Sequence, residues 1–208
     1  MTPSLARVSA RSSPPPRGPA PARSGAPEAH AQAADGRLAL LDHLLASLDE
    51  REICELALDW LSRTVPLRRA MILVVDPDRD HLVGRAGYGL PAGSVERASV
   101  DLSNRKSFLA LALEGHEPVS IDARIARTAA ADAPLGRVSF QAVPLGTAEA
   151  SGLLLISGFP GGVPDPVRWV ARVVGVRLRA LRALRLEHEN GRLPVSYTHL
   201  TLPTILRV

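Results

Sequence analysis

Two short apolar runs flank a polar turn in residues 138–157, which read Val138-Ser139-Phe140-Gln141-Ala142-Val143-Pro144-Leu145-Gly146-Thr147-Ala148-Glu149-Ala150-Ser151-Gly152-Leu153-Leu154-Leu155-Ile156-Ser157. Each run has the length of a strand and is rich in branched apolar residues, and residues 146–149 carry turn chemistry. Strands joined by a short turn pair antiparallel. The stretch therefore predicts a hairpin inside a largely antiparallel sheet.

Four more strands are predicted upstream of this hairpin. Residues 69–75 form an apolar run bounded by the turn residues 76–78, and residues 81–88 follow as the partner of a second hairpin. Residues 96–102 alternate well enough for a third strand, and residues 118–122 form a short fourth. Together with the hairpin in 138–157, these segments predict a sheet of about six strands.

Helices are predicted before, within and after the strands. Leucines recur at helical spacing from Arg37, and a second helix begins at Asp49. A third is capped by Ser103 or Asn104 and ends at Gly115, after which residues 123–136 look irregular. A long helix runs from about 166 to 192 behind the cap residue Asp165. The sum is an α+β fold, with helices collected on one face of the sheet and a long C-terminal helix.

The two ends of the chain differ from this pattern. Residues 1–36 are rich in Pro, Ala, Ser and Arg and are predicted to be a disordered leader, because they carry too few large apolar side chains to form a core. Residues 195–204 resemble the translated sequence of a sequencing-library adapter, so 194–208 is interpreted as a non-native tail on a truncated chain. The folded domain is then expected over 37–158 and a linker helix over 165–193.

Composition narrows the class of protein. The net charge of +4 arises from arginines interleaved with acidic residues, and only 3% of the residues are aromatic, so a nucleic-acid surface with stacking side chains is not indicated. The single cysteine, Cys54, excludes an internal disulfide and lies in a helical pattern, where a buried thiol is expected. No apolar run is long enough to span a bilayer and no signal peptide is evident, which predicts a cytoplasmic protein without a membrane partner.

Three blocks of sequence follow one another in a fixed order: the helix-to-strand segment 60–76, the helix and Pro-Val strand of 107–119, and the Val-Pro-Leu and Gly-Leu strands of 141–145 and 152–156. Together these blocks resemble the GAF domain, a small-molecule-sensing module of bacterial signalling proteins. The resemblance covers about residues 38–157 and depends on the order and spacing of these blocks. None of the three blocks is a catalytic motif.

The resemblance implies a ligand pocket on the sheet face opposite the helices, roofed by about 100–137. The residues expected to line it are Val100, Phe108, Ile125, Phe140 and Gln141. For the apolar four, ordinary core packing is the alternative. Gln141 stands out because a polar side chain in an apolar strand needs a partner, which a ligand could supply.

Specialised activities of this family are not indicated. Cys54 lies in an early helix rather than in the pocket region where a bilin would attach, and the cyclic-nucleotide signature is not apparent. The free-methionine sulfoxide reductases of the family require several cysteines, so that activity is excluded by the resemblance. No cofactor is assigned.

Other candidate sites are weak. Asp76, Asp78 and Asp80 alternate but lack the Gly and Glu of a calcium loop, and a solvated turn is favoured. Ser107 could form a nucleophilic triad on paper with His116 and Asp122. No nucleophile elbow accompanies it, so an ordinary helix and loop are favoured. We therefore expect no metal site and no catalytic residue.

The sequence predicts a non-enzymatic sensory input domain of a bacterial signalling or transcriptional regulator. Its output domain, expected to be an ATPase, a kinase or a cyclase, would follow the linker helix. That helix is expected to pair in a homodimer and to relay the state of an unknown small molecule. The alternative is a structural dimerisation domain with a filled core and no ligand.

Overall fold

The computed structural model describes residues 26–76, 78, 80–128, 133–147 and 149–191. The chain divides into two compact units, residues 1–36 and 37–208, and the fold described below is that of the second. Within the first unit, the described part is the beginning of helix α1. Most of the predicted leader (1–25) and the predicted adapter-derived tail (194–208) lie outside the described residues.

Six antiparallel strands form one sheet in the order β3-β2-β1-β6-β5-β4. The strands are β1 (Ala70–Asp76), β2 (His81–Tyr88), β3 (Ser99–Asp101), β4 (Val119–Ile121), β5 (Phe140–Pro144) and β6 (Gly152–Ser157). The predicted hairpins β1–β2 and β5–β6 are both present, and β1 pairs with β6 at the centre of the sheet. The α+β prediction with about six antiparallel strands is confirmed.

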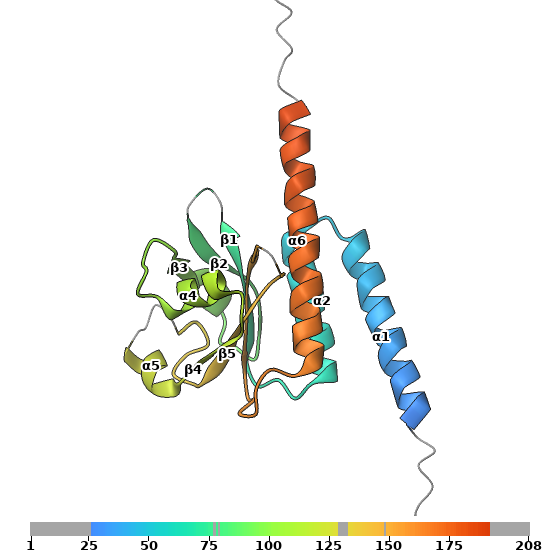
Figure 1. The fold of residues 1–208 in the computed structure, drawn as a ribbon, viewed down its shortest axis with the longest axis horizontal. Helices are drawn as coiled ribbons and strands as arrows, with labels where there is room; N and C mark the ends of the chain where they lie inside the picture. The colour runs from blue at the N-terminus through green and yellow to red at the C-terminus, as the bar shows by residue number, and fades with distance from the viewer. Residues whose placement is uncertain (1–25, 77, 79, 129–132, 148, 192–208) are drawn as a thin grey trace, which may run out of the picture. The chain divides into compact units, whose positions relative to one another are not determined.

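Two long helices cover one face of this sheet. The helices of the chain are α1 (Ala26–Ala46), α2 (Glu50–Thr64), α3 (Ser94–Arg97), α4 (Phe108–Gly115), α5 (Ala123–Thr128) and α6 (Asp165–Gly191). Helices α2 and α6 run side by side on one face, where the ring centroids of Trp60 and Trp169 are 5.4 Å apart (Figure 1). The short helices α4 and α5 lie on the other face (Figure 1).

Alternation along the strands divides the core into two clusters, because successive side chains of a strand point to opposite faces. Ala70, Ile72 and Val74 of β1 pack with α2 and α6. Met71 and Leu73 pack towards the other face, with Leu109 of α4. Both clusters are filled by side chains that are almost fully buried. The space between the sheet and the short helices is therefore occupied by the protein's own residues.

Helix α4 begins later than predicted, at Phe108, with Ser107 as its N-cap. The Ser107 hydroxyl accepts a hydrogen bond from the Ala110 amide at 3.2 Å. The two predicted caps are held in turns instead: the Ser103 amide donates to Asp101 at 2.8 Å, and Asn104 accepts from the Lys106 amide at 3.2 Å. Such local side-chain bonds compete with helix formation.

Three other segments also differ from the predictions. Helix α1 begins at Ala26 inside the predicted leader, where alanine, the strongest helix former, is frequent. Residues 94–97 form helix α3 where the start of a strand was predicted, after Gly93 in the left-handed conformation. Helix α5 occupies part of the predicted irregular segment, because Asp122 accepts from the Arg124 amide and Ser139 accepts from the Ala123 amide at its first turn.

Helix α6 approaches the β5–β6 turn unusually closely. The Gly146 amide donates to the Ala171 carbonyl at 3.1 Å, and the Ser151 hydroxyl donates to the Gly175 carbonyl at 3.3 Å. A Cβ atom at Gly175 would lie 2.2 Å from the Gly146 nitrogen, so only glycine fits there.

Within the described part of the chain, no helix combines the length and the apolar character needed to cross a bilayer.

Candidate functional site

A pocket of about 870 Å³ opens at one end of the sheet. Strand pairing brings its walls together: Ala70 is opposite Ile156, Phe140 is opposite Ser157, and Ile121 is opposite Phe140. The start of β1, the end of β6, the start of β5 and the end of β4 therefore meet. The pocket is lined by Arg68, Arg69, Ser120, Ile121, Asp122, Val138, Ser139, Phe140, Gln141, Ile156, Ser157, Gly158, Phe159 and Pro160.

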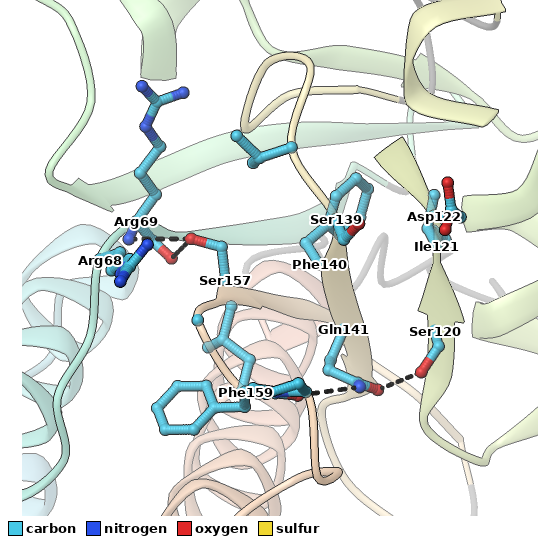
Figure 2. A pocket seen from close by; sticks show the side chains of 14 residues that line it. Arg68, Arg69, Ser120, Ile121, Asp122, Ser139, Phe140, Gln141, Ser157 and Phe159 are labelled. Atoms are coloured by element: carbon cyan, nitrogen blue, oxygen red, sulfur yellow. Dashed lines mark hydrogen bonds between the residues drawn. The ribbon is translucent and has the colours of Figure 1, made fainter. Parts of the chain in front are cut away.

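Arg69 and Ser157 fix the floor of the pocket. The Ser157 amide donates to the Arg69 carbonyl at 2.9 Å. The Ser157 hydroxyl accepts from the Arg69 amide at 3.1 Å and donates to the Arg69 carbonyl at 3.2 Å (Figure 2). The Arg69 side chain donates to the Leu135 carbonyl at 3.0 Å. These bonds tie β1 to the last residue of β6 and to the segment that enters β5.

Gln141 links two walls of the pocket. Its amide oxygen accepts a hydrogen bond from the Ser120 hydroxyl of β4 at 2.9 Å (Figure 2). Its amide nitrogen donates to the Phe159 carbonyl at 3.5 Å, a long and weak contact. The partner that Gln141 needs is thus supplied in part by β4 and by the chain that follows β6.

The five residues predicted to line a pocket occupy different places. Phe140 and Gln141 line the pocket at the sheet end. Val100 is buried in the core beneath the short helices, and Ile125 of α5 packs against that core from outside. Phe108 begins α4 with 37% of its surface exposed. The structure therefore brings two of the five together and leaves three outside this pocket.

Several lining residues were not predicted. Arg69 was expected only as the first residue of a strand, and Arg68, Phe159 and Pro160 were not expected to line a site. A usable signal does exist in the sequence: two arginines stand directly before a buried strand, and in an antiparallel sheet that end meets the end of a neighbouring strand. The pairing of β1 with β6 that makes them neighbours spans 88 residues of sequence between Arg69 and Ser157.

The chemistry of the pocket suits binding. Its lining set offers two guanidinium groups, three serine hydroxyls, one amide and one carboxylate, together with the rings of Phe140 and Phe159. No histidine, cysteine or lysine is among these lining residues, so no serine there has a neighbouring imidazole base. Over the described residues, no cluster of His, Cys, Asp and Glu has the arrangement of a metal site.

A second polar cluster joins α6 to the rest of the fold. Glu50, at the start of α2, has only 10% of its side chain exposed and lies 3.3 Å from Arg185, 3.7 Å from Arg182 and 3.8 Å from Arg85. Arg182 also donates to the Val75 carbonyl at the end of β1. A single carboxylate therefore holds three arginines from β2 and α6.

Arg177 makes a further anchor on α6. Its guanidinium donates to the carbonyls of Leu44 at 2.8 Å, Leu45 at 3.0 Å and Ser47 at 2.7 Å. These carbonyls lie at the C-terminal end of α1 and just after it, where helix carbonyls lack partners and attract cations. Helix α6 is thus attached at separate points to the α1–α2 connection, to α2 and to the sheet.

Comparison with known proteins shows which solved structures share this architecture. No protein-family profile matches the chain, and no curated protein matches it. Among solved structures, the GAF domain of an Acinetobacter phosphoenolpyruvate-protein phosphotransferase is 16% identical, with a TM-score of 0.59 over 74% of this chain and 96% of that one. Residues 122 to 287 of a methyl-accepting chemotaxis protein are 17% identical, with a TM-score of 0.57 over 70% of this chain and 98% of that one.

An enzyme shares the same architecture. The free methionine-R-sulfoxide reductase from Neisseria meningitidis, solved with its substrate, is 16% identical, with a TM-score of 0.53 over 74% of this chain and 93% of that one. At these identities the likeness concerns the fold and not the activity. The strand order, the paired helices α2 and α6 and these similarities together show that this chain has the GAF fold.

Proposed function

We propose that this chain is a small-molecule-sensing input domain of a bacterial signalling or transcriptional regulator, acting in the cytoplasm. The ligand would bind in the pocket at the sheet end, and helix α6 would carry the response towards an output domain. The signalling role is supported by GAF-fold neighbours that include a chemotaxis protein and a phosphotransferase. The pocket volume of about 870 Å³ is in the usual range for small-molecule sites, about 300–1,000 Å³.

The observation that carries this proposal is the continuity between the pocket wall and α6. Ser157, Gly158, Phe159 and Pro160 line the pocket, and α6 begins only a few residues later, at Asp165. Phe159 also packs on the core formed with α2 and α6. A ligand that moves this wall would therefore act directly on the start of the helix.

The relay requires that α6 can adopt two arrangements and that the domain binds the ligand with a different affinity in each. The anchors at Arg177, Arg182 and Arg185 supply the contacts that would differ, because they are hydrogen bonds and ion pairs to separate elements. If the start of α6 shifts, these contacts either resist the movement or break and let the rest of the helix move. The expected readout is a change in α6 far from the pocket.

The test combines a ligand screen with two variants. Compounds that raise the thermal midpoint would be retested on Gln141→Leu, which removes a pocket amide, and on Phe108→Ala, which trims a half-exposed residue outside the pocket. We expect Gln141→Leu to abolish the stabilisation and Phe108→Ala to retain it. Hydrogen exchange should also slow over residues 165–177 with ligand bound. Stabilisation lost only in Phe108→Ala, or an unchanged α6, contradicts the proposal.

The structural alternative retains one observation in its favour. The space beneath the short helices, where the resemblance implies a ligand, is filled by buried side chains such as Leu82, Val100 and Leu109. A domain that only dimerises would show this filled core and would bind nothing at the sheet end. A screen in which every compound leaves the thermal midpoint unchanged would favour that alternative.

A further inference from the structure

The charges in the pocket are unevenly distributed. Arg68 and Arg69 lie directly before β1, whereas Asp122, the carboxylate in the lining set, lies directly after β4 on the opposite side (Figure 2). Asp122 is also engaged locally, since it accepts a hydrogen bond from the Arg124 amide at 2.7 Å as it caps α5. The arginine side of the pocket therefore has an excess of positive charge.

Arg68 is the exposed member of the pair. Its aliphatic stem lies over Gly158, where an added Cβ would be 3.4 Å from the Arg68 Cγ atom. Arg68 is exposed and is one of the residues that line the pocket. Arginine presents five N–H donors in a planar fork that matches carboxylate and phosphate oxygens. Arg69 is already held by the Leu135 carbonyl and serves as a fixed second charge.

Two other polar groups of the lining keep a proton to donate, whereas the Ser120 and Ser157 hydroxyls already donate to Gln141 and to the Arg69 carbonyl. The Ser139 oxygen accepts a hydrogen bond from the Ala123 amide at 3.0 Å, which leaves its hydroxyl proton to donate. The Gln141 oxygen is occupied by Ser120, and its amide nitrogen makes one long contact with the Phe159 carbonyl, so its second N–H is the group left to a ligand. Beside these donors, Phe159 and the largely buried Phe140, which is 3% exposed, form the aromatic part of the lining.

We propose that the pocket binds a small molecule carrying an oxyanion, carboxylate or phosphate, at its arginine side and an apolar body against the two phenylalanines. This inference rests on the proposed function, because it assigns a ligand class to the pocket invoked there. The oxyanion contacts the Arg68 fork, and the ring or chain of the ligand extends towards Phe140. A neutral analogue loses the charge-assisted bonds and binds more weakly.

The experiment uses four compounds that share one ring: benzoate, phenyl phosphate, benzamide and benzylamine. Binding to the full chain is measured at constant ionic strength from amide chemical shifts in residues 139–141 and 157–159. We expect benzoate or phenyl phosphate to bind about tenfold more tightly than benzamide, the factor that a charge-assisted bond of about 1.4 kcal/mol gives. Which of the two anions binds more tightly separates a carboxylate ligand from a phosphate ligand.

Two arginine variants complete the design. Arg68→Gln should weaken anion binding about tenfold and leave benzamide unchanged. Arg51→Gln makes the same charge change at the far end of α2, in an exposed pair with Glu55, and should leave all affinities within about twofold. Because Arg68 is exposed, Arg68→Gln should keep the thermal midpoint of the native protein.

Two outcomes overturn the inference in distinguishable ways. If benzamide or benzylamine binds at these residues as tightly as the anions, or if Arg68→Gln and Arg51→Gln behave alike, the ligand class is wrong and the pocket stands. If none of the four compounds shifts these residues, both the ligand class and the proposed binding pocket fail.

Discussion

Cys54 is a residue whose reactivity the fold suppresses. It is fully buried in α2, and burial, reinforced by the nearby Glu50 carboxylate, raises the pKa of its thiol to about 12. Because the thiolate is the reactive form, alkylation at about pH 8 should be very slow in the folded protein. Iodoacetamide labelling followed by mass spectrometry measures this. Labelling should become complete in denaturant, and rapid labelling of the native chain would contradict the burial.

Gly175 tests how closely α6 approaches the β5–β6 turn. In an open helix, Gly→Ala would stabilise by about 1 kcal/mol. At Gly175 the added Cβ would meet backbone atoms of Leu145 and Gly146 at 2.3 and 2.2 Å, so we expect Gly175→Ala to lower the free energy of unfolding by about 1–3 kcal/mol.

The matched control for Gly175 is Gly115, at the end of α4, where an added Cβ meets nothing within 4 Å. Gly115→Ala should leave stability unchanged or raise it slightly. Urea unfolding of both variants gives the comparison. Equal stability of Gly175→Ala and the original chain would mean that α6 lies farther from the turn.

At the scale of the elements, the Glu50 carboxylate of α2 contacts Arg182 and Arg185 in the C-terminal half of α6. Glu50→Gln would leave Arg85, Arg182 and Arg185 facing one another without a counter-charge. Because those arginines are partly exposed, we expect a loss of about 1–3 kcal/mol, below the full cost of breaking a buried pair. Hydrogen exchange should also accelerate over residues 177–189, where α6 is anchored.

Glu55→Gln is the control for this loss. Glu55 is an exposed acid of the same helix that pairs with Arg51 at 2.8 Å, and such surface pairs contribute less than about 1 kcal/mol. Its removal should leave exchange in α6 unchanged. If the two variants have equal effects, the Glu50 cluster does not anchor the helix.

The elements could be predicted where the pattern is local. The hairpins β1–β2 and β5–β6 follow from apolar runs separated by turn residues, and α6 follows from its cap and periodicity. The start of α4 could not be predicted in this way, because both predicted caps lie in turns: the Ser103 amide donates to Asp101, and Asn104 accepts from the Lys106 amide. Sequence periodicity does not reveal these turns.

The pocket was harder to predict than the sheet. Phe140 and Gln141 are neighbours on β5, and their side chains point to opposite faces, so no single face could hold both. They line one pocket because it opens at the end of the sheet, where both faces are accessible. That position depends on where four strands end relative to one another. The position of the pocket is set by strand registers such as Ile121 opposite Phe140. These registers depend on the tertiary structure and cannot be read from the local sequence.

In the molecule as a whole, α6 extends beyond the core. Leu178 and Leu181 are buried, whereas residues 183–189 are exposed, including Leu184 at 53% and Leu186 at 60%. A helix end without packing is marginally stable in water. Pairing of this end with a second copy would bury the exposed leucines, as the proposed signalling role requires.

We therefore expect the chain to form a homodimer that depends on the end of α6. Sedimentation velocity across a range of concentrations should show the dimer for the original sequence. Leu184→Glu should shift it to monomer, because a carboxylate placed in an apolar seam is costly to desolvate. Leu38→Glu makes the same change at an exposed leucine of α1 and should leave the dimer intact. A dimer that survives Leu184→Glu and dissociates with Leu38→Glu would move the interface from α6 to α1, and the relay through α6 would then lack a partner helix.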